Sequence, residues 1–159
     1  MPAPRSNRRV PSVIDLARTS VRRDALAAAD SSLLALSALV GSTVRGPDGA
    51  RLGRLVDLVA SWTTDPYPAI TGLVASIAGR RAFIDIRAVA DLDPVRGASL
   101  GSTLVDLRPF ERRQAEVLLA GDVLDHQLVD VDGVQVIRAN DLLVARVGTS
   151  IRLVGVDIG

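Results

Sequence analysis

Few residues of this chain are spaced in the way that catalysis requires. The single histidine, His126, lies between a short apolar turn and an expected strand, with Asp122 and Asp125 close by in sequence. No glycine-framed serine accompanies it, so a Ser-His-Asp hydrolase would lack its nucleophile turn. We therefore expect an exposed loop histidine and no catalytic residue.

Metal binding has equally little support. The aspartate pairs Asp91 with Asp93 and Asp130 with Asp132 offer the oxygen ligands that Mg²⁺ and Ca²⁺ prefer. The spacing of a calcium loop is absent, because no glutamate follows Gly133. The chain also has no cysteine for a thiolate metal site and no lysine for a phosphate-binding loop. We interpret both pairs as turn-capping residues and predict neither a metal nor a cofactor.

The charge pattern argues against a nucleic-acid-binding protein. All 19 basic residues are arginine, a bias that fits a GC-rich genome. Residues 1–32 hold six arginines and three aspartates, a net charge of +3, whereas residues 33–159 hold 13 arginines and 15 acids, a net charge of −2. Proteins that bind phosphate backbones usually concentrate basic residues on a folded face. This chain concentrates them in its leader.

The expected fold is all-β. Residues 1–32 form a basic leader that is either disordered or, over Val13–Ala29, a short amphipathic helix. Beyond Leu39, short apolar runs alternate with glycine, proline and Asp-Gly, as is typical of small barrels and sandwiches. The longest apolar stretches, such as Leu33–Val40 with Ser37 inside it, are much shorter than the ~20 residues that a membrane-spanning helix needs, so no span is expected. Pro94–Gly101 is predicted as a loop. The expected strands are Ser42–Arg45, Arg51–Trp62, Ala69–Ala78, Arg81–Ile86, Thr103–Leu107, Gln127–Val131, Val134–Arg138, Leu142–Val147 and Ile151–Ile158.

Two segments match when the sequence is shifted by 84 residues: 38–59 falls on 122–143. Each contains an apolar turn, a strand, an Asp-Gly pair and a longer strand that reaches Asp-Leu at Asp57 or Asp141. Glycine supplies the positive φ of a tight hairpin, so the Asp-Gly pairs define the two hairpins. The match predicts a tandem duplication of one small unit. The hairpin-defining residues are Asp48, Gly49, Asp132 and Gly133.

These motifs resemble those of the PRC-barrel domain family. The resemblance covers most of residues 38–159 and implies two small PRC-like β-barrel units in tandem. Ile137 stands where the family pattern has a glycine, at the position matched by Gly53. The segments that carry the resemblance are Leu39-Val40-Gly41, Pro47-Asp48-Gly49 and Leu52-Gly53-Arg54-Leu55-Val56-Asp57-Leu58, then Asp122-Val123-Leu124-Asp125, Val131-Asp132-Gly133 and Val136-Ile137-Arg138-Ala139-Asn140-Asp141-Leu142.

A narrower resemblance concerns function. The run Leu104–Arg113 is similar to the connection in actinobacterial MgtE-like proteins, where the tandem unit precedes an MgtE N-terminal helical domain and CBS domains. It implies a non-catalytic, cytoplasmic binding or regulatory module of a magnesium transport protein, or a partner of one, that reaches the membrane only through that partner. The alternative is an adaptor in ribosome assembly or RNA processing, as in the ribosome maturation factor RimM. That alternative expects a preceding translation-factor-like barrel, which residues 1–32 do not supply.

The expected organisation is a first unit at 33–100, a linker at 101–114 and a second unit at 115–159. The second unit stops after an apolar strand without a counterpart of Arg81–Ile86. An open apolar edge needs a cover. The linker strand Thr103–Leu107, further chain after Gly159, a partner domain, or a second protomer in a homodimer would each close it.

The linker holds the best candidate for contact with another protein. An arginine cluster beside an exposed aromatic ring is common in interfaces. The alternative is a plain connector, in which the ring packs against the barrels and the arginines stay solvated. The candidate interaction residues are Arg108, Phe110, Arg112 and Arg113.

Overall fold

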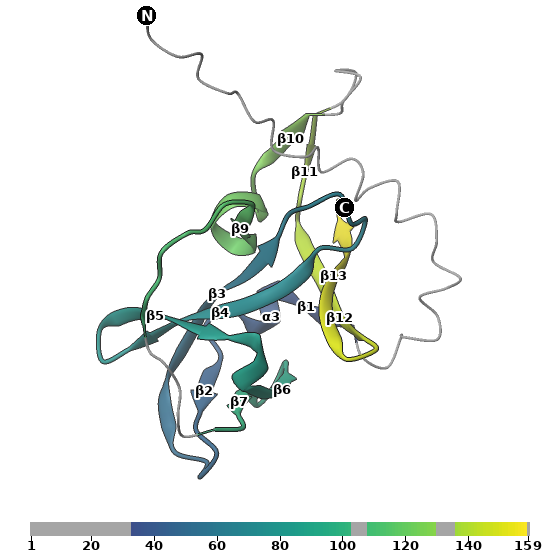
Figure 1. Ribbon diagram of the computed structural model, residues 1–159. Helices are drawn as coiled ribbons and strands as arrows, with labels where there is room; N and C mark the ends of the chain where they lie inside the picture. The colour runs from purple at the N-terminus through teal and green to yellow at the C-terminus, as the bar shows by residue number, and fades with distance from the viewer. Residues whose placement is uncertain (1–32, 103–107, 130–135, 159) are drawn as a thin grey trace, which may run out of the picture.

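The structure, a computed structural model, describes residues 33–102, 108–129 and 136–158. These residues are mostly strand, and one large sheet curls into a nearly closed, barrel-like body (Figure 1), so the all-β prediction is confirmed at this level. In chain order the elements are β1 (Leu34–Ala35), α3 (Leu36–Leu39), β2 (Thr43–Arg45), β3 (Arg51–Ser61), β4 (Ala69–Ile77), β5 (Arg80–Asp85), η2 (Ile86–Ala88), β6 (Val89–Asp93), β7 (Gly97–Leu100), β8 (Arg108–Pro109), β9 (Glu116–Leu118), η3 (Leu119–Val123), β10 (Gln127–Val129), β11 (Val136–Arg138), β12 (Asp141–Val147) and β13 (Ser150–Asp157).

The large sheet draws strands from both halves of the chain. Its order is β1-β12-β13-β4-β3-β2-β7-β6, while β5 pairs with β4 and β8, and β9 pairs with β3. Strands β10 and β11 form a separate ribbon that stands out from this body (Figure 1). Within the described ranges, no helix is long and apolar enough to cross a membrane.

The core follows from the alternation of side chains along the long central strands. Leu58 of β3, Leu73 of β4 and Ile84 of β5 are completely buried in one continuous cluster. Leu142 and Leu153, from β12 and β13, are buried in the same cluster. Burying a side chain of this size contributes about 1.5–3 kcal/mol. The two halves are therefore held together by one shared core.

Eight of the nine predicted strands correspond to β2, β3, β4, β5, β10, β11, β12 and β13, with ends that differ by a few residues. The predicted loop Pro94–Gly101 is wrong, because Gly97–Leu100 forms β7, which pairs with β2 and β6. A Cβ atom at Gly97 would lie 2.1 Å from the carbonyl oxygen of Thr43. Glycine lets the two backbones approach this closely. Gly97 therefore belongs to a strand, although glycine in the sequence was interpreted as part of a loop.

The prediction that the last strand lies at an open edge is also wrong. Strand β13 pairs with β12 on one side and meets β4 on the other, with Arg152 opposite Ala69. The backbone N–H of Leu153 donates to the carbonyl of Pro68, and the Arg152 guanidinium donates to Asp65 and to the carbonyl of Tyr67. The loop between β3 and β4 thus covers the start of β13.

Several predictions fall outside the described residues. These are the leader 1–32 with its helix, the linker strand Thr103–Leu107, and the second hairpin turn with Asp132 and Gly133. The strands that flank this second turn, β10 and β11, are described and pair antiparallel. The first hairpin is described throughout. Gly49 has a φ of +81° there, and the Asp48 carboxylate accepts the N–H of Ala50.

The matched segments begin with the same backbone conformation. Each has a single helical turn, α3 or η3, whose next residue is extended: Val40 at φ −62° and ψ 129°, Leu124 at φ −60° and ψ 135°. The residue after that has positive φ, +84° at Gly41 and +63° at Asp125. Because η3 holds five residues and α3 four, the second turn accommodates one extra residue.

The contacts around these turns also correspond. The N–H of Gly41 donates to the carbonyl of Leu55 at 2.7 Å, and the N–H of Asp125 donates to that of Ala139 at 2.9 Å. Arg54 donates to the carbonyl of Gly41, and the matching Arg138 pairs with the Asp125 carboxylate. The corresponding strand registers are Thr43 with Arg54 and Gln127 with Arg138, then Val44 with Gly53 and Leu128 with Ile137.

The two segments exchange their supporting contacts. The Asp57 carboxylate accepts hydrogen bonds from the N–H groups of Ala120 and Gly121 in η3, at 2.7 and 2.9 Å. In return, the Asp141 carboxylate accepts the N–H and the hydroxyl of Ser37 in α3. Strand pairing follows the same rule, since β1 pairs with β12 and β9 with β3. Each half therefore completes the other.

The departure at Ile137 has a packing explanation. A Cβ atom at Gly53 would lie 2.0 Å from the carbonyl oxygen of Ser76, because β4 runs beside β3 at that point. Ile137 lies on β11, which among the described residues pairs with β10 alone. The second segment lacks the close neighbour that makes glycine necessary in the first.

Candidate functional site

A cluster of two phenylalanines and an arginine marks one surface of the molecule. Phe83 projects from β5, and the ring of Phe110 packs against it with centroids 6.2 Å apart. The Arg113 guanidinium lies 5.8 Å from the Phe83 ring centroid, in the range of a cation–π contact. Both rings remain partly exposed, so the cluster offers apolar and cationic surface together.

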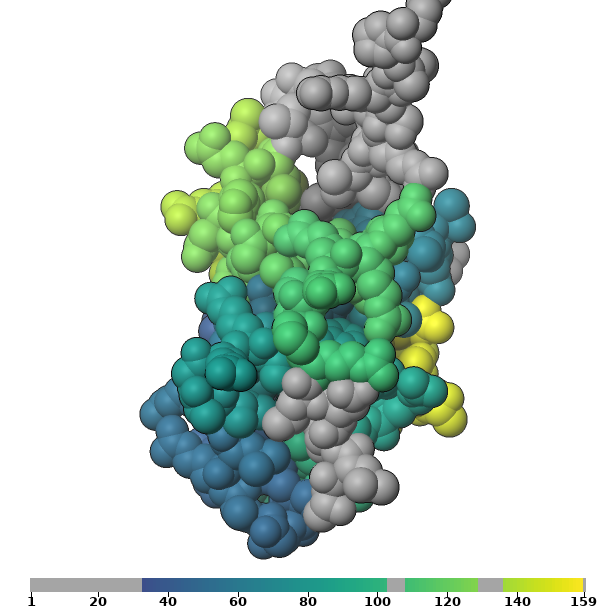
Figure 2. All heavy atoms as spheres, turned by 60° about the vertical axis from the view of Figure 1, so that its left-hand side comes forward, coloured from purple at the N-terminus to yellow at the C-terminus, as the bar shows by residue number. Residues whose placement is uncertain are grey.

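Two members of this cluster, Phe83 and Arg113, line an open depression with a volume of about 340 Å³. The segment that starts at β8 crosses this face of the body, the green band at the centre of Figure 2. We refer to the depression as the Phe83 groove. Its lining residues are Phe83, Arg108, Pro109, Glu111, Arg112, Arg113 and Glu116.

Polar contacts fix the shape of this segment. The Glu116 carboxylate accepts the N–H of Arg113 at 2.8 Å, and the Arg112 guanidinium pairs with Asp122 at 3.0 Å. Asp122 also accepts the N–H of Leu118 at 2.8 Å. Because Asp122 belongs to η3, these bonds connect the rim of the groove to the helical turn that Asp57 supports.

The charges in and near the groove have distinct roles. Arg112 is paired with Asp122, whereas the Arg113 guanidinium is exposed above Phe83. The pKa of Asp85, next to Phe83, is lowered chiefly by its hydrogen bond from Arg87, with a further contribution from Arg113. The groove therefore has a cationic side at Arg113 that suits a carboxylate on a bound partner.

Three of the four residues predicted for interaction, Arg108, Arg112 and Arg113, line this groove, and the fourth, Phe110, packs its ring against Phe83. Arg108 lies opposite Phe83 in the pairing of β8 with β5. Sequence reasoning missed Phe83, although the alternation of β5, with Ala82 and Ile84 inside, directs Phe83 outward. It also missed Glu116, whose role depends on its bond to the Arg113 backbone.

Asp57 is the one charged residue that is buried among the described residues, with a relative exposure of 4%. Sequence matching paired it with Asp141 but assigned neither a role. Burial raises the pKa of Asp57 above its ordinary value of 3.8, and the hydrogen bonds from Ala120, Gly121 and Leu58 only partly offset this. Its two oxygens are occupied by backbone donors, so its role here is to support η3.

The raised pKa of Asp57 predicts a pH dependence of stability. Between pH 3.8 and the raised value, the folded chain retains a proton that the unfolded chain has released. The contribution of Asp57 to the free energy of unfolding is therefore fully present below pH 3.8 and falls as the pH rises through this window. Urea unfolding across this range should show wild-type stability declining relative to Asp57→Asn. If the free energy of unfolding of the wild type instead rises relative to that of Asp57→Asn as the pH increases through this range, the assignment is wrong.

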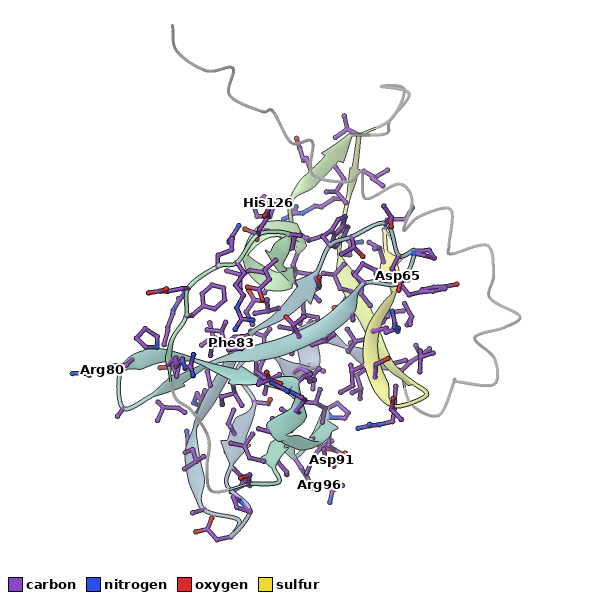
Figure 3. The ribbon with its side chains drawn as sticks, viewed as in Figure 1. Asp65, Arg80, Phe83, Asp91, Arg96 and His126 are labelled. Carbon is purple, nitrogen blue, oxygen red and sulfur yellow. The ribbon has the colours of Figure 1, made fainter. Side chains whose placement is uncertain are left out.

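His126 is exposed near the top of Figure 3, where its Nδ1 lies 3.0 Å from the carbonyl oxygen of Leu124. The backbone N–H of His126 donates to the carbonyl of Val123. The structure thus places it in the turn after η3, at the position that Ser42 occupies after α3.

The first aspartate pair caps a turn. The Asp93 carboxylate accepts the N–H groups of Val95 and Arg96, and the Arg96 guanidinium lies 3.7 Å from Asp91 (Figure 3). Asp130 and Asp132 lie outside the described residues. In the described part of the chain, no three His, Cys, Asp or Glu residues gather as metal ligands.

Comparison with known proteins gives no match: neither a protein-family model nor a curated protein corresponds to this chain.

Proposed function

We propose that this chain is a non-catalytic binding module of the PRC-barrel type, which docks another protein in the Phe83 groove. The observation that carries this proposal is the cluster of Phe83, Phe110 and Arg113, which combines exposed aromatic surface with a cationic group. Aromatic and arginine side chains are the usual anchors of protein interfaces.

The internal match supports assignment to a tandem PRC-type architecture. A duplicated unit would retain the corresponding turns, strand registers and carboxylate contacts that the two segments share. The turns differ in that η3 has one residue more than α3. In this proposal the two units are not separate barrels. They exchange β1 and β9, so that each unit closes the sheet of the other.

The proposed partner is the cytosolic region of an MgtE-like magnesium transport protein, with its helical and CBS domains. The resemblance of residues 104–113 suggests this partner, and the groove suits a segment with an apolar side chain and a carboxylate. The module would then act in the cytoplasm, by assembly rather than turnover. Asp57 supports this view, because backbone N–H groups occupy its oxygens and leave no free base there.

Isothermal titration of the full chain with the cytosolic region of the MgtE-type transporter from the same organism tests the proposal. We expect saturable binding that weakens at least about tenfold, or roughly 1.4 kcal/mol, in Phe110→Ala and in Arg113→Ala. Both side chains are partly or fully exposed, so both variants should keep the wild-type melting temperature within a few degrees.

Arg96→Ala is the matched control, since this exposed arginine pairs with Asp91 and Asp93 away from the groove. It should bind like the wild type. Absence of binding, or equal affinities for all variants, would reject the proposal. Salt-sensitive association with ribosomal particles instead would favour the assembly-factor alternative.

A further inference from the structure

Two adjacent arginines line the Phe83 groove, and their guanidinium groups have different neighbours. A terminal nitrogen of Arg112 lies 3.1 Å and 3.0 Å from the two carboxylate oxygens of Asp122. The Arg113 guanidinium instead lies over the Phe83 ring. The chain itself therefore engages one of the two arginines, while the other stands beside the exposed aromatic surface.

Asp122 is a fixed anchor for Arg112, because the turn to which it belongs is attached to the core. Two N–H groups of η3 donate to the buried Asp57 carboxylate. Asp122 also accepts the N–H of Leu118 at 2.8 Å, and Leu118 belongs to β9, which pairs with β3. The Arg112 side chain is thus bound to a part of the fold that is held from two sides.

The backbone next to Arg112 forms a short closed turn. The N–H of Arg113 donates to the Glu116 carboxylate at 2.8 Å, and the N–H of Glu116 donates to the carbonyl of Arg113 at 3.2 Å. Glu116 begins β9, so the C-terminal side of this turn is attached to β3. The bond from Arg112 to Asp122 attaches its N-terminal side.

We infer that Asp122 is a positioning residue of the Phe83 groove: it holds Arg112, and in this way fixes the backbone that places the Arg113 guanidinium over Phe83. This inference rests on the proposed docking function and adds that Arg112 acts through Asp122 rather than on the partner. The side chains of Arg112 and Asp122 are 49% and 33% exposed, so their pairing contributes little to global stability. Its loss is expected to affect docking instead, because a partner would no longer meet an arginine that is already in place.

Single and double substitutions distinguish positioning from direct contact with the partner. Arg112→Gln removes a positive charge from the groove, whereas Asp122→Asn removes a negative charge and leaves an oxygen that can accept the N–H of Leu118. If charge alone decided the affinity for a partner with a carboxylate, the first variant would bind more weakly and the second more tightly.

We expect instead that each single variant binds the cytosolic region of the MgtE-type transporter at least about threefold more weakly in isothermal titration. The double variant should bind no more weakly than either single variant, because the two residues act as a unit. Tighter binding by Asp122→Asn, or additive losses in the double variant, would overturn the inference.

A second measurement uses the free chain and needs no partner. In Asp122→Asn, the Arg113 amide should exchange with solvent at least about threefold faster than in the wild type, with the melting temperature unchanged within a few degrees. Asp125→Asn is the matched control, because it breaks the exposed pair of Asp125 with Arg138 just after η3 and away from the groove. It should leave both the exchange and the affinity unchanged.

The free-chain measurement separates this inference from the proposed function. An unchanged Arg113 amide in Asp122→Asn would overturn the inference whether or not the transporter region binds. Faster exchange of that amide, without any binding by the wild type, would support the positioning role of Asp122 and reject the proposed partner.

Discussion

Replacing Asp57 with alanine is expected to lower the free energy of unfolding by roughly 3 kcal/mol. The carboxylate accepts the N–H groups of Leu58, Ala120 and Gly121 at 2.8, 2.7 and 2.9 Å. Hydrogen bonds to a charged acceptor contribute about 1.5–3 kcal/mol each, though not additively. Without the carboxylate, the donors of η3 face a partly buried space with no acceptor. Urea unfolding should show a lower midpoint with an unchanged slope.

Asp141→Ala is the matched control. Asp141 makes the corresponding bonds to Ser37 and Leu142, but those to Ser37 lie in an exposed position where water can replace the lost acceptor. We expect a loss of about 1 kcal/mol. Equal losses in the two variants would contradict the difference in burial on which this prediction depends.

Gly97→Ala has the second large expected effect, also a loss of roughly 3 kcal/mol. Two costs combine in this variant. The φ of +85° disfavours any residue with a Cβ atom by about 1–2 kcal/mol. The new methyl group would also meet the Thr43 carbonyl oxygen at 2.1 Å, which forces β7 away from β2. Urea unfolding measures the total, and amide exchange should show that β7 loses protection.

Gly79→Ala separates the two costs. Gly79 has a φ of +76°, but no atom lies within 4 Å of the position of its Cβ. Only the conformational cost applies, so the expected loss is about 1 kcal/mol. If the two glycine variants lose the same stability, the close approach of β7 to β2 is not a constraint in solution.

The sequence predicted the strands whose side chains alternate or form long apolar runs. The β3 and β4 strands were found in this way, because β-branched and leucine residues fill both. Strand β7 was missed for a physical reason. It begins with Gly97, Ala98 and Ser99, which do not read as a strand, and the reason for Gly97 is tertiary: a Cβ atom there would meet the Thr43 carbonyl oxygen of β2.

The candidate site was predicted in part. A run of arginines around Phe110 is visible in the sequence, but its neighbour Phe83 comes from a strand whose pairing with β8 is a tertiary feature. The exchange of carboxylate contacts was not predictable either. Asp57 and Ala120 are 63 residues apart, and nothing in the local sequence specifies that one supports the other. The sequence match indicated that Asp57 and Asp141 correspond, but the fold determines where each carboxylate binds.

The exchanged contacts also bear on the proposed function. The chain that lines the groove, from β8 onward, continues into β9, which pairs with β3. It then enters η3, where the N–H of Ala120 donates to the Asp57 carboxylate. The rim of the groove is therefore anchored to the core through the chain that follows it. In addition, Asp122 of η3 pairs with Arg112 on the rim. A partly rigid rim lowers the entropy cost of docking, because fewer side chains must be ordered on binding.

The most direct test of a docking module is to map where the partner binds. Backbone amide signals of the isotope-labelled chain are recorded while the cytosolic region of the MgtE-type transporter is added. We expect the largest shifts at Phe83, Phe110, Arg113 and Glu116, with little change at Asp91 and Arg96. Shifts that avoid the groove, or an unchanged spectrum at saturating concentrations of the transporter region, would contradict this expectation.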